Sequence, residues 1–151
     1  MTQHPLVKTP CIGVCSTGIG DTVCRGCKRF SHEVIQWNAY SQEERRAVLA
    51  RIDELLAQIV ERWLRIEDKS LLLEQLQGQQ IGFDPARAPA SWVVELLKAG
   101  ASQIGEPSEF GLLPTTQAQG KALRELRDLI EKEFYELSCA HYERYFQRAP
   151  L

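Results

Sequence analysis

The chain has no apolar run approaching the eighteen or so residues of a membrane span, because Arg, Glu, Asp or Lys interrupts every candidate. It also lacks an excess of one charge sign: 18 basic and 20 acidic side chains give a formal net charge of −2. This value is too close to zero to indicate a nucleic-acid-coating or membrane-surface protein by electrostatics alone. A length of 151 residues, 44% apolar and 25% charged, is typical of an ordinary globular domain. We therefore expect a soluble, folded protein and exclude most multi-domain enzymes.

The familiar enzyme motifs are missing as well. The sequence contains no Walker phosphate loop, no G-x-G-x-x-G after a strand, no G-x-S-x-G and no H-E-x-x-H. Cys139 and His141 suggest a nucleophile and base, but positions two apart on a helix do not face each other. The sequence thus argues against an enzyme, leaving open only a site completed by the loop region 78–120.

The first ten residues show no basic region followed by an apolar stretch, which a secretory signal requires. We therefore expect a cytoplasmic, reducing environment. Cytosolic disulfides seldom persist, and the five cysteines are an odd number. A disulfide framework is accordingly the weaker explanation of the cysteines.

Four of the cysteines cluster with the spacing C-x3-C-x8-C-x2-C: Cys11, Cys15, Cys24 and Cys27. Two close pairs joined by a short loop can place four sulfurs at the corners of a tetrahedron around one metal. Gly13 and Gly26, inside the pairs, allow backbone N–H groups to turn toward thiolate sulfur. The pattern predicts a small metal-binding knuckle, with a reduced, metal-free cluster as the alternative.

Four thiolates around a divalent ion carry excess negative charge, which nearby cations should offset. Five residues are candidates for this charge compensation or for contacts behind the ligands: Lys8, Arg25, Lys28, Arg29 and His32. The basic residues could instead form a nucleic-acid patch, although phosphate-binding proteins usually carry larger basic fields. His32 could also replace a ligand, but four cysteines are already present.

The cysteines and the residues after them resemble a known family. The elements are Pro10-Cys11-Ile12-x-x-Cys15, Cys24-Arg-Gly-Cys-Lys-Arg-Phe30, Glu33-Val-Ile-x-Trp37-Asn and Tyr40-Ser-x-Glu-Glu-Arg-Arg-x-Val48. Together they are similar to the domain of unknown function 1289, a family of short bacterial proteins commonly described as predicted iron-sulfur proteins. The resemblance covers about residues 9–55 and implies a tetrathiolate site at the four clustered cysteines, with no known reaction.

The identity of the metal stays open between zinc and an iron-sulfur cluster, since both use four cysteines at such spacings. With thiolates at every position around a single ion, none is left for activating water. The centre is therefore expected to be structural or redox-active rather than hydrolytic.

Beyond residue 40 the pattern becomes helical. Ser41-Gln-Glu-Glu44 is a capping box, and the apolar stripe from Val48 to Trp63 predicts a long helix. The stripe is interrupted at 67–70, where we expect a bend or break, before it resumes at 71–76.

Two more helices are predicted farther along the chain. One runs from about 91 to 99, capped by Ser91. The other spans roughly 119–147 after a second capping pattern at Thr116-Gln-Ala-Gln119, with a long loop at 100–115 before it. No convincing strand pattern appears.

These segments predict an all-α fold: a small N-terminal four-cysteine metal knuckle followed by a helical hairpin or bundle. We expect two domains, with 1–66 holding the knuckle and the first long helix and 67–151 forming a helical extension packed on it. Trp37 and Tyr40 are expected to pack the knuckle onto the helix, with stacking on nucleic-acid bases as the alternative. A further aromatic set is expected in the core, or alternatively as a partner-binding face: Tyr135, Tyr142, Tyr145 and Phe146.

The functional hypothesis is a non-catalytic interaction or regulatory module, folded by its metal, that binds a protein or alternatively RNA. The other hypothesis is an iron-sulfur protein that transfers electrons or carries its cluster. The sequence does not predict the oligomeric state.

Overall fold

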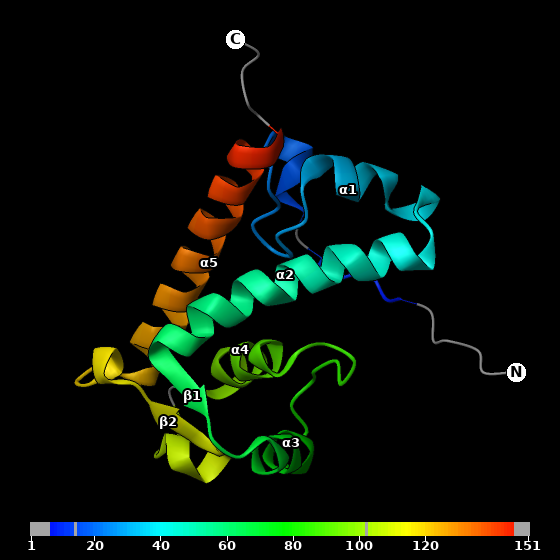
Figure 1. Ribbon diagram of the computed structural model, residues 1–151. Coiled ribbons are helices and arrows are strands. Elements are labelled where there is room, and N and C mark those ends of the chain that lie inside the picture. Colours follow the sequence, from blue (N-terminus) through cyan, green and yellow to red (C-terminus); the bar gives the residue numbers. More distant parts are fainter. Residues whose placement is uncertain (1–6, 14, 102, 147–151) are drawn as a thin grey trace, which may run out of the picture. The chain divides into compact units, whose positions relative to one another are not determined.

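The computed structural model describes residues 7–13, 15–101 and 103–146. It is mostly helical, as predicted, with short 3-10 helices between the longer elements (Figure 1). The α-helices are α1 (Ser31–Gln36), α2 (Gln42–Trp63), α3 (Lys69–Gly78), α4 (Pro89–Gly100) and α5 (Leu123–Phe146). The 3-10 helices are η1 (Ser16–Ile19), η2 (Trp37–Ala39), η3 (Pro107–Phe110) and η4 (Thr116–Ala118). None of the helices in the described ranges has the length and apolarity that crossing a bilayer demands.

A small sheet modifies the all-α expectation. Strands β1 (Leu64–Ile66) and β2 (Leu112–Pro114) pair antiparallel, with Arg65 opposite Leu113. At three residues each, the strands are too short to show the alternating pattern by which strands are recognised in a sequence. The sheet was therefore missed because it depends on a pairing between segments far apart in the chain.

The chain forms two compact units. The first contains residues 1–52 and 135–151, and the second contains residues 53–134, so α2 and α5 each contribute to both. The predicted domain boundary at residues 66 and 67 is not tested by this division and stays a prediction.

The predicted start of α2 is confirmed. The Ser41 hydroxyl accepts from the Glu44 N–H at 3.1 Å, and the Glu44 carboxylate accepts from the Ser41 N–H at 3.0 Å. The expected interruption at 67–70 also occurs, because the chain leaves α2 at Trp63 and Asp68 then caps α3 through the Leu71 N–H. Local capping chemistry thus fixes both boundaries.

Two helix starts differ from the prediction. Helix α4 begins at Pro89, whose fixed φ suits the first helical position, while Ser91 lies inside the helix and donates its hydroxyl to the Ala88 carbonyl. The pattern at Thr116–Gln119 caps no long helix. It forms η4, and Gly120, with φ of 79°, turns the chain before α5 begins at Leu123. The predicted end of this last helix at 147 lies outside the described residues.

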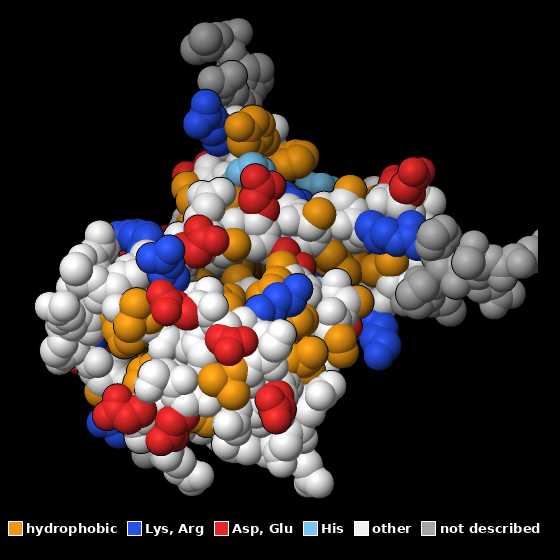
Figure 2. Space-filling model, turned by 60° about the horizontal axis from the view of Figure 1, so that its bottom comes forward, with side chains coloured by type: hydrophobic (Ala, Val, Ile, Leu, Met, Phe, Trp, Pro, Cys, Tyr) orange, Lys and Arg blue, Asp and Glu red, His pale blue; other side chains and the backbone are white. Residues whose placement is uncertain are grey.

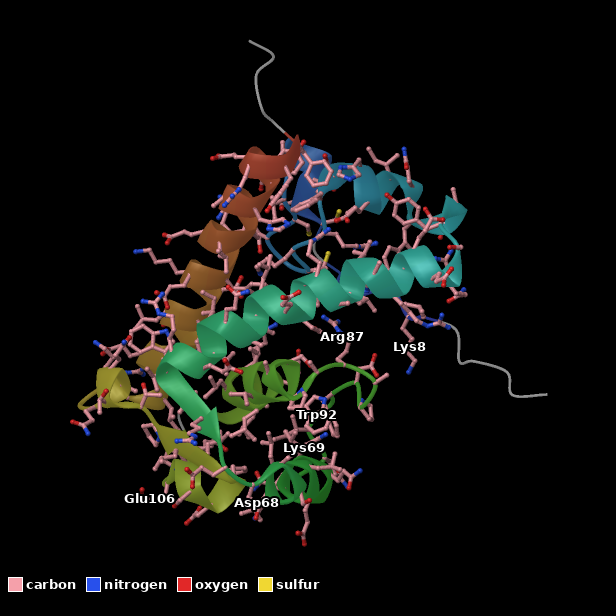
Figure 3. The ribbon with its side chains drawn as sticks, in the orientation of Figure 1. Lys8, Asp68, Lys69, Arg87, Trp92 and Glu106 are labelled. Atoms are coloured by element: carbon pink, nitrogen blue, oxygen red, sulfur yellow. The ribbon has the colours of Figure 1, made fainter. Side chains whose placement is uncertain are left out.

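The second unit has an apolar core of side chains that are at most 1% exposed: Val60, Leu64, Leu72, Leu76, Val93, Leu96, Leu97 and Leu126. Around this core, Arg87 makes a bidentate ion pair with Asp53, and the Trp92 ring packs edge-on against Phe83 at 5.6 Å. Figure 3 labels Arg87 and Trp92 near the start of α4. On the face shown in Figure 2, acidic and basic side chains are interspersed, as the small net charge suggests.

One glycine of this unit is confined by a neighbouring backbone. Gly111 has φ of 73°, and its carbonyl accepts from the N–H groups of Glu67 and Asp68. A Cβ at this position would overlap the Asp68 carbonyl oxygen, whereas a Cβ at Gly120 would meet nothing within 4 Å. The two glycines share a left-handed backbone and differ in the space around them.

Replacing each of these glycines with alanine distinguishes the cost of a steric clash from the cost of a left-handed backbone. We expect Gly120→Ala to lower the free energy of unfolding by about 1–2 kcal/mol, the cost of placing a Cβ on a left-handed backbone. Gly111→Ala should cost at least about 3 kcal/mol, because the Asp68 backbone must also move. Urea unfolding followed by circular dichroism measures both, and equal losses would contradict the close approach at Gly111.

Candidate metal centre

The second cysteine pair lies at the tip of a small hairpin in the first unit. The Cys24 N–H donates to the Arg29 carbonyl at 2.9 Å, the Ser31 N–H donates to the Thr22 carbonyl at 2.8 Å, and Val23 bridges to Phe30. The turn closes with the Lys28 N–H on the Cys24 carbonyl at 2.8 Å. We call residues 22–31 the cysteine hairpin.

Cys24 and Cys27 are both buried, and their thiols interact with each other. Burial opposes ionisation of Cys24, but N–H groups of Cys27, Ser16 and Gly26 and the Cys27 side chain outweigh it, lowering the pKa of Cys24 from 9.0 to about 7. Burial raises the pKa of Cys27, and Arg29 opposes that rise. The pair therefore provides a thiolate near neutral pH beside a second sulfur.

The first pair is built differently. Cys11 and Cys15 are exposed, and the Gly13 N–H donates to the Cys11 sulfur at 3.4 Å with φ of 90° at Gly13. The predicted use of Gly13 is thereby confirmed, as is that of Gly26, whose N–H points to Cys24. The Cys15 sulfur lies 2.9 Å from the Thr17 hydroxyl.

Ser16 joins the two pairs. It directly follows Cys15, it is 6% exposed, and its N–H donates to the Cys24 sulfur. Its hydroxyl accepts from the Arg25 N–H at 2.8 Å. The chain next to the first pair is thus tied by two hydrogen bonds to the residues of the second pair.

Three of the five residues predicted to compensate the thiolate charge lie in the cysteine hairpin: Arg25, Lys28 and Arg29. The Arg29 Nε donates to the Cys27 sulfur at 3.3 Å, and the Lys28 ammonium donates to the carbonyls of Arg25 and Gly26, between the two cysteines. Arg25 instead pairs with Asp21 at 3.3 Å. The two buried cations, Lys28 and Arg29, therefore donate hydrogen bonds within the cysteine hairpin itself.

The other two candidates lie elsewhere. Lys8 is exposed, and Figure 3 shows its side chain extending outward from the ribbon. His32 contacts the rings of Phe30 and Phe146 at 5.9 and 5.1 Å rather than a sulfur. Neither contributes a sulfur contact that the structure describes.

The four sulfurs do not form a ready-made cage. Among residues 7–13, 15–101 and 103–146, no group of three or more His, Cys, Asp or Glu side chains is placed to hold a metal ion. The donor types nevertheless fit a soft divalent metal or an iron-sulfur cluster, and the N–H groups directed at Cys24 suit a bound thiolate. Coordination by Cys11, Cys15, Cys24 and Cys27 stays a prediction.

Sequence reasoning missed the group that anchors the hairpin. The Glu33 carboxylate accepts from the Phe30 N–H at 2.8 Å and from both terminal nitrogens of Arg51, one of them at 2.8 Å. The Arg51 guanidinium also lies 3.9 Å above the Phe30 ring. Phe30 has no capping oxygen, so the Phe30–Glu33 spacing is not a capping-box signal in the sequence, and nothing local indicates Arg51 either.

Removing Arg51 should destabilise the first unit strongly. Arg51→Met keeps the length of the side chain but leaves the Glu33 carboxylate, 6% exposed, without its counter-charge. We expect a loss of about 3–5 kcal/mol in the free energy of unfolding, measured with urea. Arg46→Met, at an exposed position of the same helix, is the matched control and should change stability by less than about 0.5 kcal/mol.

The remaining candidate residues differ in burial and contacts. Trp37 is 6% exposed and lies beneath the guanidinium of Arg29 at 4.9 Å, which confirms its expected place in the core. Cys139 interacts with the Tyr135 hydroxyl one helical turn away, and His141 contacts the rings of Phe30 and Tyr145. Tyr145 and Phe146 are 60% and 53% exposed, so they are not core residues.

Residues 9–56 match the family model described as Protein of unknown function (DUF1289). The resemblance seen in the sequence is thus confirmed over the segment that holds the four clustered cysteines, Glu33 and Arg51. The match covers about a third of the chain and ends within α2. No curated protein and no solved structure matches the chain.

Proposed function

We propose that Cys11, Cys15, Cys24 and Cys27 bind one metal centre that orders a non-catalytic module for docking a partner protein. The observation that supports this most directly is the position of Ser16. The Ser16 N–H donates to the Cys24 sulfur, and the Ser16 hydroxyl accepts from the Arg25 N–H. Cys15, the residue before Ser16, is therefore joined directly to a residue that contacts the second pair. Binding of one metal by all four cysteines would require the exposed sulfurs of Cys11 and Cys15 to move toward those of Cys24 and Cys27.

The environment of the second pair supports thiolate ligation. A low pKa at Cys24 favours the ionised sulfur that metals require, and Arg29 and Lys28 offset the charge of the site. Four protein sulfurs would leave no position for a water molecule on a single ion. The centre is therefore proposed to be structural, with zinc as the first candidate.

The exposed apolar residues favour a protein partner. Apart from Leu113, the large apolar side chains that are exposed in the described part of the chain all belong to the first unit: Ile12, Ile19, Ile35, Tyr145 and Phe146. Ile12 and Ile19 lie between the clustered cysteines in sequence, and Ile19 is 86% exposed. A contiguous exposed apolar patch marks a protein-binding surface, and these side chains are the candidates for one in the first unit.

RNA is the less favoured partner. Lys28 and Arg29 are 2% and 4% exposed, and Arg25 is engaged with Asp21 and Tyr135. Two of the three basic residues of the cysteine hairpin are thus buried, and the exposed one, Arg25, already pairs with Asp21, which leaves little basic surface for phosphates.

One observation favours the iron-sulfur alternative. Cys11 and Cys15 are both exposed, so a cluster held by the four cysteines would have one side open to solvent. Such exposure suits electron exchange or transfer of the cluster. This alternative shares the four ligands and differs in the inorganic group.

Elemental analysis of anaerobically purified protein tests the centre. We expect about one zinc ion per chain in the wild type, loss of most of the metal in Cys24→Ser, and retention in Cys139→Ser. Cys139 is the control because it is the one cysteine outside the proposed ligand set. Iron with equimolar sulfide and a brown colour would select the alternative, and equal metal content in both variants would refute the ligand set.

Co-purification from lysate of the source cells tests the docking surface. Proteins retained by the wild type should be lost with Ile19→Asp and kept with Leu113→Asp, since Leu113 is an exposed apolar residue of the other unit. Retention that nuclease treatment abolishes would indicate RNA instead. An unchanged set of proteins with Ile19→Asp would contradict docking beside the cysteines.

A further inference from the structure

The cysteine hairpin makes aromatic contacts with the end of α5, outside the family match. Phe30, the buried residue near the exit of the hairpin, has ring centroids of three α5 residues around it: Tyr142 at 5.0 Å, Phe146 at 5.2 Å and His141 at 6.2 Å. His32, two residues later, lies 5.1 Å from Phe146. Figure 2 shows histidine and hydrophobic side chains next to one another on the surface.

A second contact comes from inside the C-x2-C pair itself. The Arg25 guanidinium lies 4.4 Å above the Tyr135 ring, while Asp21 holds the same guanidinium at 3.3 Å. Tyr135 and Tyr142 are two helical turns apart on α5. We call this set of contacts the α5 clasp: Arg25, Phe30 and His32 on one side, and Tyr135, His141, Tyr142 and Phe146 on the other.

The hairpin side of the clasp is a short segment held by three backbone hydrogen bonds between its own residues. Residues 22–31 contain one isolated bridge between Val23 and Phe30 and a turn at Lys28 with φ of 68°. A segment this short cannot form a core of its own, so its conformation depends on what its cysteines bind and on the Glu33–Arg51 pair. The positions of Arg25 and Phe30 depend on that conformation in turn.

We infer that metal binding by the four cysteines controls the docking of residues 135–146, with the α5 clasp transmitting the state of the hairpin to the helix. This inference rests on the proposed metal centre and concerns its regulation. With the hairpin ordered, the clasp holds the last three turns of α5. With the hairpin loosened, these turns lose their contacts, and the partly buried ring of Tyr142 becomes more exposed.

Hydrogen exchange on the full chain, followed by mass spectrometry, tests the inference. The protein is measured with its metal and after removal of the metal by chelation under reducing conditions. We expect amide exchange in 135–146 to rise about tenfold or more when the metal is removed, and exchange in 89–100 to stay within about twofold. The reference segment 89–100 is α4 of the second unit, which contains no clasp residue.

Two substitutions keep the test independent of the cysteines. Phe30→Leu should retain the metal but exchange rapidly in 135–146 even when the metal is present, because the ring contacts are gone. Tyr142→Leu removes the α5 partner and should behave in the same way. Phe83→Leu, which removes a ring packed against Trp92 in the second unit, should leave exchange in 135–146 unchanged.

The outcomes separate the two proposals. If elemental analysis finds no metal at the cysteines, the proposed centre fails, and the regulation built on it fails with it. If the metal is present and its removal leaves exchange in 135–146 unchanged, only the clasp is overturned. An equal rise in 135–146 and 89–100 would also overturn it, because the whole chain would then be unfolding.

Discussion

The first unit depends on one buried carboxylate. Glu33 accepts hydrogen bonds from the backbone of Phe30 and from Arg51, and so joins the exit of the cysteine hairpin to α2. Because a buried charge without a partner is costly, the hairpin, α1 and α2 are constrained to meet at this point. The orientation of the Phe30 ring, and with it the contacts to α5, follows from the same constraint.

The cysteine hairpin shows how a small segment can support negative sulfur without a core of its own. Backbone N–H groups of Cys27, Ser16 and Gly26 point to Cys24, and Arg29 donates to Cys27. These donors come from residues within a few positions of the cysteines, so the sequence carries most of this environment locally. A bound metal would change the conformation of the first pair most, because Cys11 and Cys15 are exposed.

Features decided by local chemistry could be predicted from the sequence. The Ser41–Glu44 capping box, the break before α3 and the role of Gly13 each depend on neighbours in the chain. The pairing of β1 with β2 and the pairing of Glu33 with Arg51 join distant segments, and no local pattern encodes them. The start of α4 was misplaced because Pro89 and Ser91 both favour helix starts and the fixed φ of proline prevailed.

Lys28 has an unusual combination of properties, since it is 2% exposed and adopts a left-handed backbone that glycine would adopt more easily. Its ammonium group, however, donates hydrogen bonds to the carbonyls of Arg25 and Gly26, which lie between the two cysteines in the chain. Glycine at position 28 would adopt this backbone without strain but would lack the cation. An uncharged residue with a side chain would keep the backbone strain and would also lack the cation. The side chain at position 28 is therefore constrained by electrostatics as well as by backbone conformation.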